Sequence, residues 1–89
     1  MTNIIKRHGH EEKFDERKVY ASVFAACLTA HRNENHAEEV AEKVTEAVKK
    51  WLKAKKKIEA EDLYTAINDN LKKVDADAYF LYKTHRDSC

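Results

Sequence analysis

The 89-residue chain contains no proline, only one glycine and only two cysteines. Without proline, nothing in the sequence forces a helix to kink or to end. Cys27 and Cys89 have neither metal-ligand spacing nor an evident pairing, so we expect Cys27 to be a small buried residue and Cys89 a free thiol. No apolar run approaches the roughly 20 residues of a membrane-spanning helix, and the N-terminus does not resemble a signal peptide. We therefore expect a cytoplasmic protein.

The chain also lacks a clear excess of either charge, because 17 Lys and Arg against 16 Asp and Glu leave a net charge of only +1. No global field then favours nucleic acid or an acidic membrane, and any attraction for an anion has to be local. The chain contains neither of the two glycine-rich phosphate-binding motifs, G-x-x-x-x-G-K-[ST] and G-x-G-x-x-G, and no serine or cysteine nucleophile beside a base. We therefore do not expect an enzyme. Its length predicts one small domain over residues 1–89.

The first part of the chain is the one stretch without a helical pattern. Short alternating runs flank Gly9, which predicts a β-hairpin over residues 3–14 with a two-residue turn at His8-Gly9. Such a turn places Lys6 opposite Glu11. A hairpin of this size is not stable alone, so the helices that follow must support it.

Apolar residues at three- and four-residue steps predict four helices after the hairpin. Asp15 and Asn35 are the expected N-caps of the first two, and Leu28 and Trp51 fall on their apolar stripes. Lys57-Ile58-Glu59 is expected to add a third, edge strand to the hairpin. The predicted fold is mainly α with a small β-hairpin sheet that caps a four-helix cluster, with helices over about 16–30, 36–54, 60–73 and 75–87.

A run of lysines ends the second predicted helix and has two interpretations. Lysines favour the negative end of a helix dipole and a solvated connection. The alternative is a polyanion site for RNA, DNA or a nucleotide, of which nucleic acid is the weaker version because arginines and exposed aromatics are missing. The residues are Lys49, Lys50, Lys53, Lys55, Lys56 and Lys57.

A second group of cations surrounds the hairpin tip. Lys6 and Arg7 precede the turn, and Lys18 lies on the first turn of the next helix, whose free N–H groups favour anions. This is a credible phosphate site, although cross-strand ion pairs of Lys6 and Arg7 with nearby glutamates explain the pattern equally well. His8 and His10 have no further ligands nearby to complete a zinc site, so we expect no metal.

Four blocks of the sequence resemble the ATP-cone domain. The first runs from Ile4-Ile5-Lys6-Arg7-His8-Gly9 through Phe14-Asp15 to Lys18-Val19. The others are Ala41-Glu42-Lys43-Val44, Ile58-Glu59-Ala60-Glu61-Asp62-Leu63 and Ala78-Tyr79-Phe80-Leu81-Tyr82-Lys83. The resemblance covers nearly the whole chain.

This resemblance implies that ATP or dATP, accompanied by Mg²⁺, binds between the hairpin and the helices. Such domains sense the adenine nucleotide pool and change oligomeric state or regulate a partner enzyme without hydrolysing the nucleotide. They occur in ribonucleotide reductases and in the transcriptional repressor of their genes. By position, phosphate contacts are implied for Lys6, Arg7 and Lys18, adenine contacts for Glu12, Asp15 and Val19, and a nucleotide-facing position for Tyr64.

The sequence departs from the family pattern at His8, where Asp is usual, and at Ala60, where a small hydroxyl residue is often found. Neither a reductase domain nor a zinc ribbon is present, so the expectation is a freestanding cone. The alternative is a cone without ligand that serves as a protein-interaction module, docking through exposed Tyr79, Phe80 and Tyr82.

Overall fold

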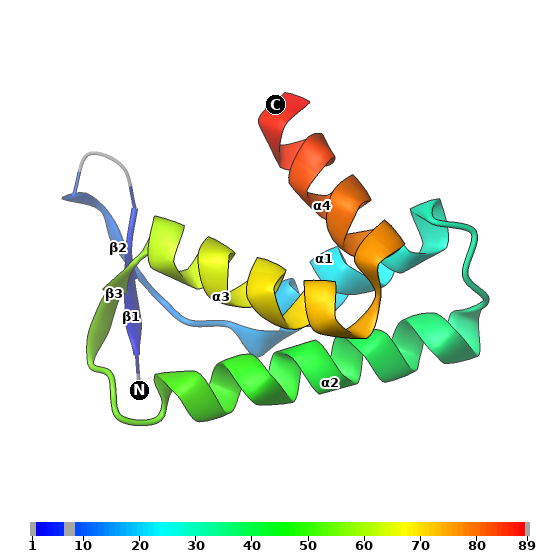
Figure 1. Cartoon of the computed structure of the whole chain (residues 1–89). Coiled ribbons are helices and arrows are strands. Elements are labelled where there is room, and N and C mark those ends of the chain that lie inside the picture. The colour runs from blue at the N-terminus through cyan, green and yellow to red at the C-terminus, as the bar shows by residue number, and fades with distance from the viewer. Residues whose placement is uncertain (1, 7–8, 89) are drawn as a thin grey trace.

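The protein folds into four helices and a three-stranded sheet, here as a computed structural model that describes residues 2–6 and 9–88, with side chains to residue 84. Figure 1 shows the sheet at one end of the helices. The fold class is therefore mainly α with a small sheet, as predicted. The elements are β1 (Asn3–Ile5), β2 (Glu11–Lys13), α1 (Glu16–Thr29), α2 (Glu34–Leu52), β3 (Lys57–Glu59), α3 (Ala60–Val74) and α4 (Ala76–Ser88).

The sheet has the strand order β2-β1-β3, in which β1 pairs antiparallel with β2 and parallel with β3. The prediction of β3 as a third, edge strand is confirmed. The predicted hairpin register is wrong by one residue, because Glu11 lies opposite Ile5 and not Lys6. The Lys6 amide instead bonds to the His10 carbonyl at 2.6 Å.

The longer connection explains this register. Gly9 has a φ of +79°, a left-handed conformation that glycine adopts readily, and its amide bonds back to the Lys6 carbonyl at 3.1 Å. Residues 7–9 thus separate the paired Lys6 and His10, where the prediction allowed only two residues. The predicted turn residue His8 lies outside the described residues.

Short polar side chains set the starts of the first two helices. Asp15 caps α1 as predicted, since its carboxylate accepts the Arg17 amide at 3.0 Å. The cap of α2 is Asn33, whose side-chain oxygen accepts the His36 amide at 2.8 Å, so the prediction of Asn35 is wrong. Asn33 has the extended backbone that a cap requires, whereas Asn35 already lies inside the helix.

The hydrophobic core forms where α1 and α3 pack on α2, and Ile4 and Ile58 of the sheet close one end of it. Cys27 is fully buried, as predicted. Leu28 and Trp51 are not: 41% and 37% of their surfaces are exposed, which corrects their predicted burial. Both lie at the edge of an apolar stripe, and the Lys55 ammonium covers the Trp51 ring at 5.1 Å from its centroid.

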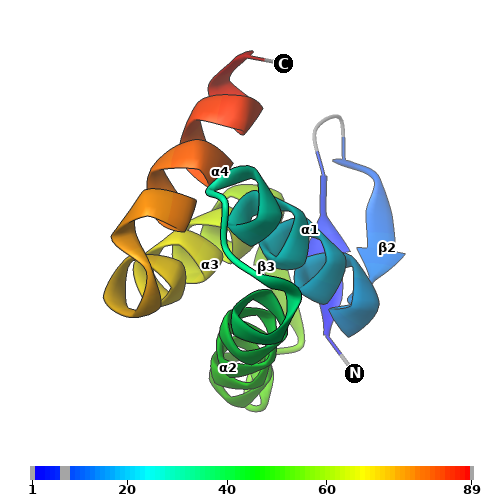
Figure 2. The same cartoon turned by 90° about the vertical axis from the view of Figure 1, so that its right-hand side faces the viewer.

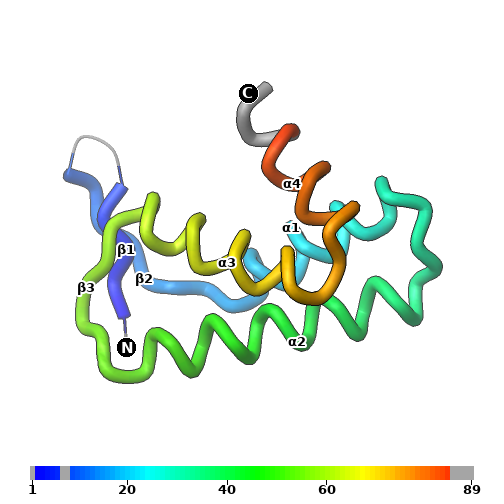
Figure 3. The backbone as a smooth tube through the Cα atoms, viewed as in Figure 1, coloured from blue at the N-terminus to red at the C-terminus, as the bar shows by residue number. Residues whose placement is uncertain are grey.

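Two polar attachments position the ends of the structure. Near the N-terminus, the Thr2 hydroxyl donates to the Leu52 carbonyl at 3.2 Å and to the Lys55 carbonyl at 2.8 Å. This places the start of β1 beside the end of α2, as the backbone trace in Figure 3 shows. The Leu52 carbonyl also accepts the Lys55 amide at 2.9 Å, so the Thr2 hydroxyl adds a second donor there and supplies one to the Lys55 carbonyl just beyond the helix.

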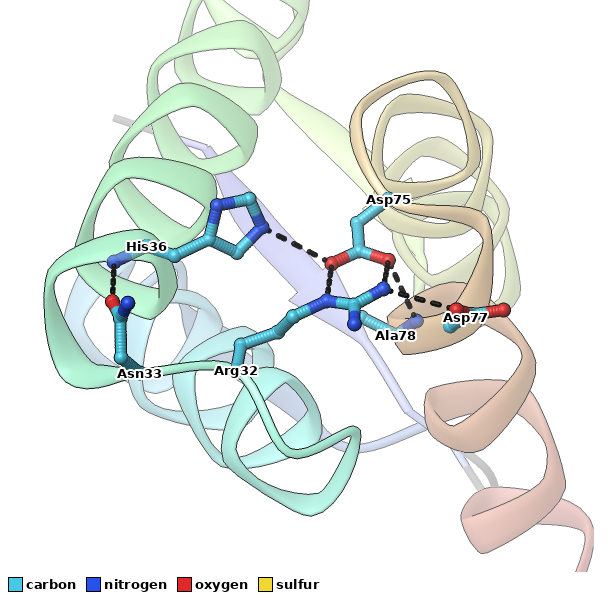
Figure 4. Close-up of polar contacts among 6 residues, drawn as sticks. All are labelled: Arg32, Asn33, His36, Asp75, Asp77 and Ala78. Atoms are coloured by element: carbon cyan, nitrogen blue, oxygen red, sulfur yellow. Dashed lines mark hydrogen bonds and ion pairs between the residues drawn. The ribbon is translucent and has the colours of Figure 1, made fainter.

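The second attachment fixes α4. The Asp75 carboxylate accepts Arg32 Nε at 2.9 Å, Arg32 Nη2 at 3.1 Å, the Ala78 amide at 3.2 Å and His36 Nε2 at 3.3 Å (Figure 4). Arg32 also bonds to Asp77 at 3.0 Å. This network ties the start of α4 to α2 and to the loop between α1 and α2. Figure 2 shows α4 and the hairpin rising on the same side of the molecule.

Candidate functional site

Two lysines from different elements converge on one carboxylate oxygen. The ammonium of Lys6, just after β1, lies 3.0 Å from Glu12 Oε1, and that of Lys18, on the first turn of α1, lies 3.6 Å from the same atom. Glu12 lies opposite the buried Ile4 and so points to the helix side of the sheet. The observed register therefore creates this cluster, which the predicted register did not contain.

The electrostatics of the cluster favour an anion between the lysines. The hydrogen bond from Lys6 and the charge of Lys18 lower the pKa of Glu12 below its usual value. One carboxylate then faces two ammonium groups, and all three side chains are at least partly exposed. A phosphate placed between Lys6 and Lys18 would take the same place as this carboxylate oxygen.

Two of the other predicted site residues have partners within the protein. The Asp15 carboxylate, besides capping α1, accepts the Arg17 guanidinium at 3.2 and 3.3 Å, and these bonds lower its pKa. Val19 lies in the hydrophobic core with 4% of its surface exposed. Arg7, the remaining predicted phosphate ligand, lies outside the described residues.

Tyr64 lies on the second turn of α3, between that helix and α4. Its ring stacks on Tyr82 of α4, with centroids 6.0 Å apart and planes at 22°. Tyr82 in turn accepts the Ser22 hydroxyl of α1 at 3.4 Å. Tyr64 therefore belongs to an aromatic contact that connects three helices, which its sequence position alone did not indicate.

The predicted docking surface on α4 is only partly present. Tyr79 and Tyr82 are half-buried and pack against the core, so their predicted exposure is wrong. Phe80 is 64% exposed. The helix period explains the difference, since Tyr79 and Tyr82 are three residues apart on the face toward the core and Phe80 points elsewhere.

One network near the start of α4 could not be predicted from the sequence. The Arg32–Asp75 network joins residues more than forty positions apart, and no local pattern marks it.

Within the described part of the chain, no group of three or more His, Cys, Asp or Glu side chains is arranged to hold a metal ion. No helix among the described residues is long and apolar enough to cross a membrane.

Comparison with known proteins supports the resemblance seen in the sequence. The model of the ATP cone domain family matches residues 2–88, essentially the whole chain. No match was found among curated proteins. Domains of this family are regulatory and non-catalytic, and they bind adenine nucleotides. The chain therefore belongs to the ATP-cone family of nucleotide-sensing regulatory domains.

Proposed function

We propose that this domain binds ATP or dATP with Mg²⁺ between the hairpin and the helices and thereby regulates its own oligomeric state or a partner enzyme. The observation that carries the proposal is the convergence of Lys6 and Lys18 on one oxygen of Glu12. The two lysines come from the hairpin and from α1. An anion that binds both would join the hairpin to the helices.

In this proposal the triphosphate replaces Glu12 as the partner of the lysines. Lys6, Arg7 and Lys18 hold the phosphates, and the displaced Glu12 carboxylate accepts hydrogen bonds from the adenine or its sugar. Asp15, Val19 and Tyr64 complete the surroundings of the base. For Asp15 this requires release from Arg17, with which its carboxylate is bonded.

Regulation follows from the size of the hairpin. Its strands have three residues each, and so small an element opens easily unless other contacts hold it. A nucleotide that bridges hairpin and helices stabilises the closed arrangement, and its loss releases the hairpin surface. The bound and free forms then offer different surfaces to a second copy or to an enzyme. The nucleotide acts as a signal and is not hydrolysed.

Isothermal titration with ATP, dATP and GTP, each with Mg²⁺ and with EDTA, tests the proposal. We expect saturable heat with ATP or dATP and a weaker response to GTP. The double variant Lys6→Glu and Lys18→Glu should lose binding and keep its helical circular dichroism. The matched control Lys13→Glu and Lys43→Glu changes the net charge equally at exposed positions outside the cluster and should bind normally.

The absence of heat with both adenine nucleotides at millimolar concentration would refute the proposal. An equal loss of affinity in both double variants would show that the nucleotide is attracted by the overall charge and not by a specific site at Lys6 and Lys18. Light scattering after size exclusion, with and without ATP, tests the regulatory part. If ATP binds but changes neither the mass of the protein alone nor its mass in a mixture with a candidate enzyme, the regulatory part is contradicted.

A further inference from the structure

A hollow of about 500 Å³ lies at the foot of the hairpin, where β1 begins and α2 ends. Its volume is within the range of small-molecule sites, about 300 to 1,000 Å³. Among the described residues of the proposed nucleotide site, only Asp15 lines this hollow, and Lys6, Glu12 and Lys18 do not. The lining residues come from the N-terminus, the connection from β2 into α1, and the end of α2: Thr2, Phe14, Asp15, Glu16, Arg17, Lys49, Leu52, Lys53 and Lys55.

The lining includes two apolar side chains. Phe14 is half-buried and packs against the core, and Leu52 is buried. The Thr2 hydroxyl is already committed to two carbonyls at the end of α2. The hollow therefore offers an apolar surface to the body of a ligand.

Cationic side chains outnumber acidic ones around this surface. The two acids each have a cation: Asp15 bonds to Arg17 at 3.2 Å, and Glu16 bonds to Lys49 at 2.8 Å. Lys53 and Lys55 make no ion pair with any described side chain. Two cationic groups thus remain for a ligand, beside the N-terminal turn of α1, whose dipole also favours an anion.

We infer that this hollow is a second anion site, which takes a small phosphorylated compound with an apolar body. Lys53 and Lys55 bind the phosphate, and Phe14 and Leu52 contact the apolar part. The pairing of Asp15 and Glu16 with their own cations removes the repulsion that these carboxylates would otherwise exert on the phosphate. Because Lys55 also covers the Trp51 ring, occupation of the site moves a cation away from that ring.

Phenyl phosphate is a suitable probe, with inorganic phosphate and phenol as its two halves. Trp51 is the only tryptophan of the chain, so its indole N–H gives a single reporter signal in a proton–nitrogen correlation spectrum. We expect saturable shifts of this signal and of the Phe14 and Arg17 amides with phenyl phosphate. Inorganic phosphate should bind more weakly, since it leaves the apolar surface unused.

A matched pair of variants distinguishes this site from the lysine run as a whole. Lys53→Glu with Lys55→Glu should weaken phenyl phosphate binding about tenfold or more, because two charged contacts are reversed. Lys50→Glu with Lys56→Glu changes the net charge equally at exposed positions outside the hollow and should stay within about twofold of the parent. If the first variant loses helicity, Lys53→Gln with Lys55→Gln replaces it, with a smaller loss expected.

Equal weakening by both pairs would overturn the inference in favour of nonspecific attraction to lysines. Shifts confined to the surroundings of Glu12 and Lys18 would also overturn it, as would shifts that fail to saturate at millimolar concentration. The variant Lys6→Glu with Lys18→Glu separates this inference from the proposed function. It should lose ATP binding and keep the phenyl phosphate response.

Discussion

Removal of the Asp75 carboxylate tests whether the network around it fixes α4. Asp75→Ala deletes the cap on the Ala78 amide, worth about 1 kcal/mol, and the charge-assisted bonds from Arg32, worth roughly 2 kcal/mol. The Asp75 side chain is 4% exposed and Arg32 is 34% exposed. The sum of about 3 kcal/mol is therefore at the lower end of the roughly 3–5 kcal/mol typical of breaking a fully buried pair.

Urea and thermal unfolding, followed by circular dichroism, measure this loss. For a domain of this size, about 3 kcal/mol corresponds to a fall in Tm of about 12 °C or more. Asp75→Asn, which keeps an oxygen for the cap, should lose about half as much. The control Asp77→Asn removes one exposed contact to Arg32 and should cost less than about 1 kcal/mol. Asp75→Ala and Asp77→Asn variants of equal stability would refute the reasoning.

The same network predicts a pH dependence. The bonds from Arg32, together with those from the Ala78 amide and His36, hold the pKa of Asp75 well below its usual range. A carboxyl with a lower pKa in the folded state stabilises the protein above its unfolded pKa of about 3.9, and this contribution disappears as the pH falls below that value. The stability difference between the parent and Asp75→Asn should therefore be full at pH 7 and shrink on acidification below about pH 4. A difference that stays constant to pH 2 would contradict this assignment.

Three further predictions concern other parts of the fold. Thr2→Val should lower the free energy of unfolding by about 1 kcal/mol in urea titrations, because two carbonyls at the end of α2 lose their hydroxyl donor, and an unchanged midpoint would contradict this. Gly9→Ala should cost about 1 kcal/mol from its positive φ alone, since a methyl group there meets nothing within 4 Å, and Gly9→Asn should cost less. In a Cys89→Ser background, the buried Cys27, whose thiol pKa is raised by burial, should react with a disulfide reagent only as fast as the protein unfolds.

Local patterns in the sequence predicted the elements better than their boundaries and pairings. Asp15 was identified as a cap because an acid immediately before a helical period has few other roles. Asn33 and Asn35 offer the same chemistry two residues apart, and only the backbone conformation decides between them. The hairpin register depended on whether the connection had two or three residues, which one glycine does not specify.

Part of the candidate site followed from the family pattern and part required the structure. The resemblance named Lys6, Glu12 and Lys18 separately, whereas their convergence on one oxygen depends on the register and on the orientation of α1. The partners of Asp75 come from segments far apart in the chain, so no window of sequence contains them. Trp51 matched the helix period and is still 37% exposed, although Val48 and Leu52 beside it on α2 are buried.

The position of β1 in the middle of the sheet has a consequence for the order of folding. One partner of β1 follows within ten residues, but the other pairs Asn3 with Lys57, 54 positions later. Closing so long a loop is costly until α1 and α2 have packed and brought its ends together. We therefore expect the sheet to form after the helices and to open before them, with faster amide hydrogen exchange at Ile4 and Ile58 than at Val44. The strand that leads into Lys6 would then be among the last parts of a new chain to become native. If adenine nucleotide binds at Lys6 as proposed, it would act on folding itself as well as on the folded protein.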